Sequence, residues 1–403
     1  MSKNENGQSR IFYKILQILM KIPVLQNIRM LFFFYDSVVA KFIKKPEKDS
    51  SKKRVLVVFP FALGDCILFL GAIENMQKIY PSGEYIRTIA CQKGYEELFT
   101  QYFDKVIPVE YTKASVNPLG RIRMIKKIRS MYFDIILDPI GCEECSPNVF
   151  STYAACGDMK IGVLENSDKK VQCPKWMRKK IYDQVLEIPD KNLHKIKFYA
   201  RVWEMLGVEK PVAHPAVLNR IEIKQQLPEK YFVVFPSASL PVKQWPIERF
   251  AEITRRIYKK TGWMLVVCGT KRDAETIEGF LREIPEIPVC NMVQKTNVPE
   301  FIEVIGRAAF VLTNDTSAYH IAVAQKRKVC AVTGRYVYNT FIDYGEMNEN
   351  YQRPIIACRK GKCCNCNNRC IFKVTDIYPC VLENTVEDVW KAVEKGLIEK
   401  EVG

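Results

Sequence analysis

The sequence lacks the short motifs that mark many nucleotide-dependent enzymes. No Gly-x-Gly-x-x-Gly follows either candidate first strand, which argues against a dinucleotide oxidoreductase, and no Gly-Lys-Ser/Thr loop suggests a P-loop ATPase. Zinc-finger spacing, a basic heptad region and an aromatic-rich RNA-binding signature are also missing. Nucleic acid is therefore not an expected partner.

Long apolar runs are missing too. Residues 11–43 alternate apolar clusters with Lys and Arg too often for a spanning helix of about 20 apolar residues. The segment also lacks the compact apolar core and cleavage site of a signal peptide, so we expect a cytoplasmic protein. We interpret it as a helix lying in the membrane interface, with its lysines toward lipid head groups. The alternative is an ordinary amphipathic helix packed on the protein.

Charge is abundant, and it is unevenly distributed. The chain has 403 residues, 48% of them hydrophobic, which is enough for two ordinary cores and long for one. Its net charge is +16, and residues 1–54 hold about half of this excess. An anionic membrane surface or a phosphorylated substrate fits this balance.

Short apolar runs alternate with helical patterns after residue 53. This alternation predicts an α/β fold with two Rossmann-like halves, each a parallel sheet covered by helices. One helix is expected over residues 66–79. We expect an N-terminal extension (1–53), a first Rossmann-like domain (54–215), a second Rossmann-like domain (216–384) with a Cys-rich loop (358–380), and a final helix (385–403) packing back across the domains.

Ligand sites in such sheets lie beyond the carboxyl ends of the strands, where this chain places polar motifs. The most informative is Asp315 to His320, at the start of a helix whose first N–H groups attract anions. Asp315 is a candidate helix cap, Thr316 and Ser317 lie in the first turn, and His320 shares the face of Thr316. The alternative is a structural cap beside a satisfied histidine.

Cysteine is plentiful, with fifteen residues, although a reducing compartment disfavours a disulfide framework. Six cysteines fall within residues 358–380. This density suggests a structural four-thiolate zinc site, with free thiols or a local disulfide as alternatives. The candidate ligands are Cys363, Cys366, Cys370 and Cys380.

Three segments together resemble glycosyltransferase family 9, the ADP-heptose lipopolysaccharide heptosyltransferase family. They are the opening strand and Leu-Gly-Asp turn ending at Asp65, the Lys-x-Trp-Pro loop at Lys243, and Asn-Asp-Thr-Ser-Ala-Tyr-His from Asn314. Two positions depart from the family, because Ser237 and Ser317 stand where glycine is common. A serine there changes how closely a ligand approaches the backbone, so the donor sugar is not fixed by the resemblance.

The resemblance implies a GT-B fold, with its two domains facing a cleft, residues 54–215 as the acceptor domain and residues 216–384 as the nucleotide-sugar domain. It also implies an inverting, metal-independent transfer of heptose or a related sugar from a nucleotide diphosphate sugar to a lipopolysaccharide core or another surface glycan. The enzyme would then work as a peripheral protein at the inner membrane face. Two alternatives are a transferase of the same fold with a different donor, and a non-catalytic homologue that binds sugar nucleotides or glycans.

The resemblance also suggests roles for individual residues. Asp65 is the candidate base, with helix N-cap as its structural alternative, and Lys243 would meet the departing diphosphate. Trp245 is expected to hold the Lys243 loop by packing. The candidate donor-binding residues are Ser237, Gly269, Asp273, Lys295, Thr296, Asp315, Thr316, Ser317 and His320. The candidate acceptor-binding residues are Arg121, Arg123 and Lys126.

Overall fold

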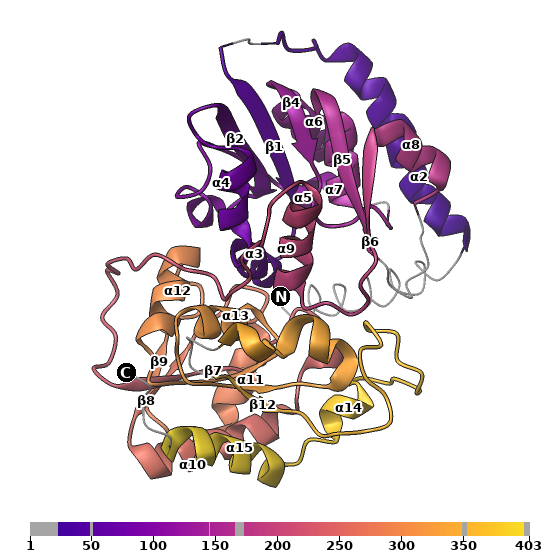
Figure 1. Ribbon diagram of the computed structural model, residues 1–403. Helices are drawn as coiled ribbons and strands as arrows, with labels where there is room; N and C mark the ends of the chain where they lie inside the picture. Colours follow the sequence, from indigo (N-terminus) through magenta and orange to yellow (C-terminus); the bar gives the residue numbers. More distant parts are fainter. Residues whose placement is uncertain (1–22, 49–50, 145, 166–172, 349–352, 399–403) are drawn as a thin grey trace. The chain divides into compact units, whose positions relative to one another are not determined.

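The computed structural model describes residues 23–48, 51–144, 146–165, 173–348 and 353–398 (Figure 1). Contacts group these residues into two compact units. Unit 1 comprises Met1–Pro60 and Tyr80–Pro189, and unit 2 comprises Phe61–Ile79 and Asp190–Gly403. Unit 2 is thus discontinuous in sequence. The domain limits at 53/54, 215/216 and 384/385 stay predictions.

Unit 1 is built on a six-stranded parallel sheet in the order β3-β2-β1-β4-β5-β6. The first strand is apolar and β-branched, and its residues from Val55 to Phe59 are fully buried, as expected for a parallel sheet covered on both faces. The strands are β1 Lys53–Phe59, β2 Tyr85–Gln92, β3 Lys105–Val109, β4 Tyr132–Leu137, β5 Cys156–Glu165 and β6 Gln184–Ile188. The helices are α2 Pro23–Phe42, α5 Tyr111–Val116, α6 Pro118–Ile128, α7 Pro147–Ala154 and α8 Lys175–Ile181.

Unit 2 repeats the scheme with the order β12-β11-β10-β7-β8-β9, again all parallel. Its strands are β7 Tyr231–Phe235, β8 Met264–Val267, β9 Val289–Asn291, β10 Phe310–Asn314, β11 Val329–Val332 and β12 Ile355–Ala357. Its helices are α3 Leu63–Leu70, α4 Met76–Ile79, α9 Lys195–Met205, α10 Ile247–Thr261, α11 Ala274–Glu283, α12 Val298–Arg307, α13 Ser317–Ala324, α14 Pro379–Leu382 and α15 Val386–Ile398.

The two sheets have the same strand order. In each, the chain starts in the middle, moves to one edge, and returns to the other side of the first strand. The order reverses between β1 and β4 in unit 1, and between β7 and β10 in unit 2. Such reversal points are where open α/β sheets bind ligands. The α/β architecture predicted from the sequence is confirmed.

The prediction of a single helix over residues 66–79 is wrong. α3 ends at Leu70, a short 3-10 turn follows at Ile73–Asn75, and α4 resumes at Met76. The break lies at Gly71, whose carbonyl accepts a hydrogen bond from the backbone N–H of His214 at 3.1 Å. A side chain at this position would place its Cβ 2.4 Å from the His214 oxygen.

The final helix has packing contacts within unit 2, and the expectation that it packs back across the domains stays a prediction. α15 contacts α10 and the strands β11 and β12, all within unit 2. Thr385 and Asp388 cap its start reciprocally, since each side chain accepts a hydrogen bond from the backbone N–H of the other. No helix among the described residues is both long enough and apolar enough to cross a membrane.

Candidate functional site

Polar residues gather in unit 2 at the reversal point of its sheet. β7 and β10 are hydrogen-bonded neighbours, and they end at Phe235 and Asn314. The predicted Ser237 loop and the Asp315–His320 corner therefore begin side by side at the carboxyl edge of the sheet. This is the position at which Rossmann-like sheets hold phosphate-bearing ligands.

Asn314 ties the loops of this edge together. Its amide nitrogen donates to the carbonyl of Pro236 at 2.7 Å and to that of Ser237 at 3.3 Å, while its amide oxygen accepts from the backbone N–H of Trp245 at 3.0 Å. The side chain is fully buried, so these bonds are shielded from water. Asn314 thus fixes both the Ser237 loop and the Lys243 loop.

Trp245 anchors the second of these loops. Its indole is completely buried, donates through Nε1 to the carbonyl of Asn384 at 2.9 Å, and meets the ring of Phe250 edge-on. The prediction that Trp245 holds the Lys243 loop by packing is confirmed. Lys243 lies in the 3-10 turn Pro241–Lys243, just before this anchor.

Lys243, Asp315 and Tyr336 form a compact charged group. The Lys243 Nζ lies 3.1 Å from the Asp315 Oδ2, and the Tyr336 hydroxyl donates to the same oxygen at 3.1 Å. The Lys243 ammonium also lies over the Tyr336 ring, 4.9 Å from its centre. The side chains of Lys243 and Asp315 are 15% and 7% exposed, so their charges interact in a poorly hydrated setting. Lys243 is thereby oriented before any ligand arrives.

Asp315 does not cap α13, contrary to the sequence-based expectation. The cap is Thr316, whose hydroxyl accepts from the backbone N–H of Ala318 at 3.2 Å. Ser317 is the first residue of the helix, and both Thr316 and Ser317 are partly exposed. The Asp315 carboxylate instead interacts with the Lys243 ammonium and the Tyr336 hydroxyl.

Asp65 lies in the first turn of α3, which packs against α13. Burial raises the pKa of Asp65 to about 6, although Lys195 and Lys243 pull it down. Ala62 is the N-cap of α3, so the alternative reading of Asp65 as the cap is wrong. Among the described residues, no other residue forms an ion pair or hydrogen bond with its carboxylate. A proton acceptor with this pKa is mostly ionised at neutral pH.

Gly64 lets α3 approach α13 closely. A Cβ at this position would lie 3.2 Å from the Cδ2 atom of His320 and 3.6 Å from the Cα atom of Ser317. The Leu-Gly-Asp motif therefore needs its glycine for packing, and the carboxylate that follows it is delivered to the α13 corner. This explains the motif physically.

His320 is buried rather than presented to a ligand. Its Nδ1 atom is paired with the Tyr344 hydroxyl at 2.9 Å, and burial lowers its pKa to about 4. The imidazole is therefore neutral at pH 7 and offers no positive charge to an anion. This matches the alternative reading of a satisfied histidine, while a direct donor contact stays a prediction.

Ser237 offers a contact that no part of the described chain uses. Its side chain is 1% exposed, and its hydroxyl has no hydrogen-bond partner among the described residues. A buried hydroxyl without a partner is costly, which fits a position reserved for a ligand or water. The serine that replaces the family's usual glycine is thus placed at the reversal point itself.

The remaining donor candidates lie beyond the next strand ends of the same sheet. Gly269 follows β8, and an added Cβ would lie 2.6 Å from the Cδ1 atom of Ile277. Asp273 closes the adjoining turn by accepting from the N–H and hydroxyl of Thr270, both at 2.8 Å. Lys295 binds the carbonyl of Asn291 through its Nζ at 2.8 Å, and Thr296 follows it. These observations give Gly269, Asp273 and Lys295 a structural role, and the donor contacts of all four residues stay predictions.

Arg121 is not the exposed acceptor contact that the sequence suggested. Its guanidinium is buried and pairs with Asp36 through two bonds, of 2.6 and 2.7 Å. The expectation failed because the partner lies 85 positions away in sequence. Arg123 and Lys126 on the same helix are exposed, and their role stays a prediction.

The Cys-rich loop does not form a metal site among the described residues. A small cavity is lined by Cys363, Cys364, Cys366, Cys370 and Cys380, yet no three Cys, His, Asp or Glu side chains there converge as a metal requires. The fourteen described cysteines are free thiols. The zinc prediction is therefore not supported by this arrangement.

Several residues of the site were not predicted. Tyr336 follows β11 and completes the Lys243 group, while Tyr344 holds His320. Lys195, the first residue of α9, is buried and is the main positive influence on Asp65. The only sign of Tyr336 in the sequence is that a polar residue follows the end of β11. No sequence pattern around Lys195 indicates that it belongs to the site.

Residues 199–365 match glycosyltransferase family 9 (heptosyltransferase). The lipooligosaccharide heptosyltransferase 2 of Haemophilus influenzae is 30% identical over 97 residues, which is 23% of this chain and 28% of that protein. The chain thus matches less than a third of the length of this curated relative.

Solved structures share the fold over most of the chain. A family 9 glycosyltransferase from Veillonella parvula has a TM-score of 0.65 at 17% identity, covering 89% of this chain and all of that one. An Escherichia coli heptosyltransferase solved with ADP has a TM-score of 0.59 at 17% identity, covering 85% of this chain and 99% of that one. The resemblance seen in the sequence is confirmed over residues 199–365, the part of the chain that matches glycosyltransferase family 9.

Proposed function

We propose that this protein is an inverting, metal-independent glycosyltransferase. It moves a sugar, heptose or a related one, from a nucleotide diphosphate sugar to a lipopolysaccharide core or another surface glycan. The family 9 domain supports the reaction class, and the ADP bound in the Escherichia coli relative supports an adenine nucleotide donor. The observation that carries the proposal is a carboxylate with a raised pKa next to an oriented lysine.

Asp65 serves as the general base. Its pKa of about 6 keeps it ionised at neutral pH and makes it more basic than an ordinary aspartate. It removes the proton of the acceptor hydroxyl while the new bond forms between that oxygen and the anomeric carbon of the donor. The bond between the anomeric carbon and the diphosphate breaks on the opposite face, which inverts the configuration.

Lys243 stabilises the departing nucleoside diphosphate. The leaving group gains negative charge as its bond to the sugar breaks, and a poorly hydrated ammonium stabilises that charge strongly. Asp315 and Tyr336 hold Lys243 in place beforehand. The N-terminus of α13 adds further positive potential, and we assign the Thr316, Ser317 and Ser237 hydroxyls to contacts with phosphate or ribose oxygens of the donor.

Replacing the base tests the proposal. Asp65→Asn is expected to lower turnover by roughly 10²–10⁴-fold while donor affinity changes little. The variant should also melt at a higher temperature at pH 7, because burial disfavours the charge that it removes. Donor affinity is measured by calorimetry, and turnover by product formation on a lipopolysaccharide extract.

Asp190→Asn is the matched control, since Asp190 lies in an exposed pair with Arg201 and should leave turnover unchanged. Unaltered turnover in Asp65→Asn would remove Asp65 as the base. Donor binding by the wild type without transfer to any glycolipid would favour the non-catalytic alternative.

A screen of nucleotide diphosphates addresses the donor. ADP is expected to raise the melting temperature more than UDP, GDP or CDP at equal concentration, because a ligand that binds more tightly stabilises the folded state more. A larger shift with another nucleotide would favour the transferase of the same fold with a different donor. The serine at position 237 makes this distinction necessary.

The acceptor defines where the protein acts. We propose that it works as a peripheral protein on the cytoplasmic face of the inner membrane, where lipid-linked acceptors are exposed. The excess of basic residues near the N-terminus supports this placement. The part of the predicted interfacial segment before residue 23 lies outside the described residues.

A further inference from the structure

Helix α2 has two different faces. One face packs on the rest of unit 1. On this face Phe33 is fully buried, and Asp36 forms the buried ion pair with Arg121. Arg121 is also stacked between the rings of Phe32 and Phe150. These contacts fix the rotation of the helix. Over the described part of the segment, the alternative of a helix packed on the protein is thus confirmed for one face, and the membrane-interface reading stays a prediction.

The opposite face of α2 carries an apolar stripe. Its members are 54–86% exposed, and their spacing of three or four residues places them along one side of the helix. Such an exposed row of large apolar side chains is unusual on a surface without a partner. The apolar stripe consists of Leu31, Phe34, Val38 and Phe42.

Helix α8 adds an aromatic and basic border. Trp176 is 48% exposed and lies edge-on to Phe33, with ring centres 6.0 Å apart. Lys180 places its ammonium 5.4 Å from the centre of the Phe33 ring. Lys175 and Lys179 on the same helix are exposed. Tryptophan and lysine in this combination are typical of side chains at a membrane interface.

A basic groove continues the surface at the carboxyl end of α2. It is lined by Phe42, the last residue of the stripe, and by four cations and one acid: Lys44, Lys45, Lys126, Arg129 and Glu47. The Arg129 Nε atom is buried without a hydrogen-bond partner, while its Nη1 atom donates to the carbonyl of Ala154. Arg129 is therefore partly committed to the protein, and the exposed positive charge of the groove comes from its lysines.

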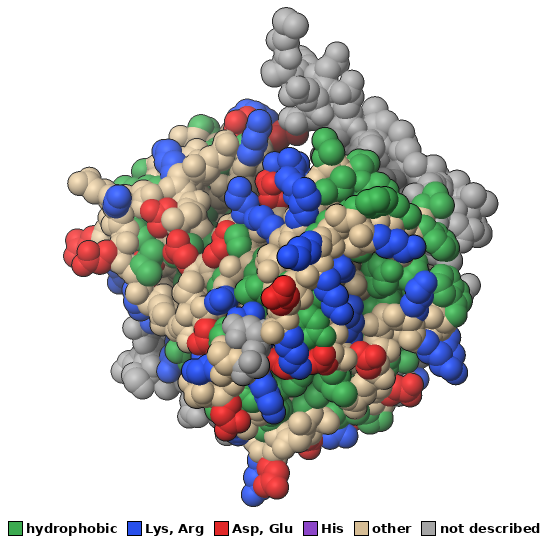
Figure 2. Space-filling model, turned by 90° about the horizontal axis from the view of Figure 1, so that it is seen from above, with side chains coloured by type: hydrophobic (Ala, Val, Ile, Leu, Met, Phe, Trp, Pro, Cys, Tyr) green, Lys and Arg blue, Asp and Glu red, His purple; other side chains and the backbone are tan. Residues whose placement is uncertain are grey.

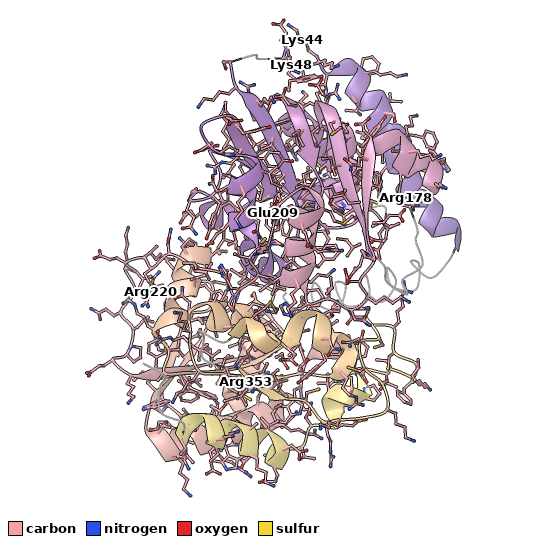
Figure 3. The ribbon with its side chains drawn as sticks, viewed as in Figure 1. Lys44, Lys48, Arg178, Glu209, Arg220 and Arg353 are labelled. Carbon is pink, nitrogen blue, oxygen red and sulfur yellow. The ribbon has the colours of Figure 1, made fainter. Side chains whose placement is uncertain are left out.

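The neighbouring Lys48 shows how the cations of the groove differ. Its Nζ lies 2.5 Å from Asp158 and 3.1 Å from Asp134, so its charge is already paired. Among the described residues, Lys44, Lys45 and Lys126 have no such ion pair. Figure 3 shows Lys44 and Lys48 beyond the end of α2, and Arg178 on α8. The unpaired positive charge is concentrated in the groove.

We propose that the apolar stripe, the α8 border and the basic groove form one docking surface for an anionic lipid bilayer. The stripe and Trp176 enter the level of the acyl chains, and the groove binds the phosphate of a lipid head group. Figure 2 shows hydrophobic side chains bordered by Lys and Arg on the side of the molecule that it presents.

Charge favours a bilayer over a second copy of the chain. Two copies meeting through this face would bring their basic borders together, and the whole protein carries a net charge of +16. Helix dipoles account for part of the basic residues, since α2 and α6 both end near the groove. They do not account for the exposed apolar stripe.

Vesicle sedimentation of the full chain tests this surface without donor or acceptor. Its result is therefore independent of the transferase proposal. We expect at least roughly tenfold stronger binding to phosphatidylcholine vesicles containing about 30% phosphatidylglycerol than to phosphatidylcholine alone. About 0.5 M salt should remove most of this preference.

Two variants separate the components of the surface. Phe34→Ser with Phe42→Ser should weaken binding to the anionic vesicles roughly tenfold or more, because two exposed anchors are lost. Lys44→Gln with Lys126→Gln should remove most of the preference for anionic lipid. The matched controls in unit 2 are Ile371→Ser, 78% exposed, and Lys224→Gln, also exposed, and both should bind like the wild type.

Equal binding by the wild type and the double serine variant would overturn the proposal. A dimer in sedimentation that the same substitutions dissociate would assign the stripe to a second copy. Much stronger vesicle binding after deletion of residues 1–22 would assign it to that segment of the chain. Release of the protein by soluble glycerophosphoglycerol would reassign the groove to a free phosphate ester.

Discussion

Three charged side chains govern the behaviour of Asp65. Lys195 and Lys243 favour its ionised form, while Asp315 and burial favour the neutral form. The raised pKa means that this carboxyl stabilises the fold most at low pH, and that this contribution is lost as pH rises through about 6. The base role that we propose for Asp65 requires the opposite state, since only the ionised carboxylate accepts a proton. The site therefore trades stability for reactivity at neutral pH.

The pH dependence of turnover should report this residue. We expect the rate to fall about tenfold per pH unit below about pH 6, where Asp65 becomes protonated. Lys195→Met should move this limb upward by about one pH unit, because it removes the main positive influence on Asp65.

The plateau rate of Lys195→Met should change little, since Lys195 acts by setting the protonation of Asp65. Lys197→Met on the same helix provides the control. An unshifted limb in Lys195→Met would contradict this role.

The Lys243 group predicts a contrast in stability. Lys243→Met should destabilise the fold by about 3–5 kcal/mol, because it leaves the nearly buried Asp315 carboxylate without its cation. Tyr336→Phe removes one hydrogen bond to the same carboxylate and should cost about 1 kcal/mol. Urea denaturation measures the free energy of unfolding of both variants. Equal destabilisation by the two substitutions would contradict this prediction.

Side chains in short motifs were predictable, and those supplied by distant loops were not. Asp65, Lys243 and Asp315 each follow a strand in a recognisable pattern, and the structure brings all three into one group. Tyr336 and Lys195 carry no local pattern, so the sequence offered no reason to choose them. Arg121 failed for a related reason, because only the fold reveals that Asp36 neutralises it.

The packing of α3 on α13 is the contact between elements on which the site depends most. Gly64→Val is expected to destabilise the fold by about 1–3 kcal/mol, because Cβ and its methyl groups would meet the His320 ring and the Ser317 backbone. Gly83→Val is the control, since no atom lies within 4 Å of a Cβ there. Thermal denaturation compares the two variants, and equal melting temperatures would show that the helices can separate without cost.

Elements with strong patterns were predicted well. The strands after residues 53, 230 and 309 are runs of apolar residues, and each is buried as expected. β5 has a weaker pattern, because Gly157, Asp158, Lys160 and Gly162 interrupt its apolar character. The break at Gly71 depends on a hydrogen bond from His214, a partner far away in sequence. Local pattern cannot reveal such a partner.

At the scale of the whole molecule, the repeated strand order explains why both sheets were foreseen. Each half alternates strands with helices and has the same strand order, so recognising one half helps to recognise the other. The charge pattern was also visible in advance, because half of the net positive charge lies in the first 54 residues. The docking surface that we propose also depends on the contact between α2 and α8, which the sequence alone does not reveal.

The chain leaves unit 1 after β1, contributes residues Phe61–Ile79 to unit 2, and then returns to form β2. A fragment starting at residue 190 would consequently lack the helix that covers the Ser317–His320 corner, and it would expose that apolar surface to water. Chimeras that exchange sugar specificity between relatives must therefore transplant two separate stretches of gene. A chimera with a single crossover would take Asp65 from one relative and Lys243 from the other, although the two side chains influence each other.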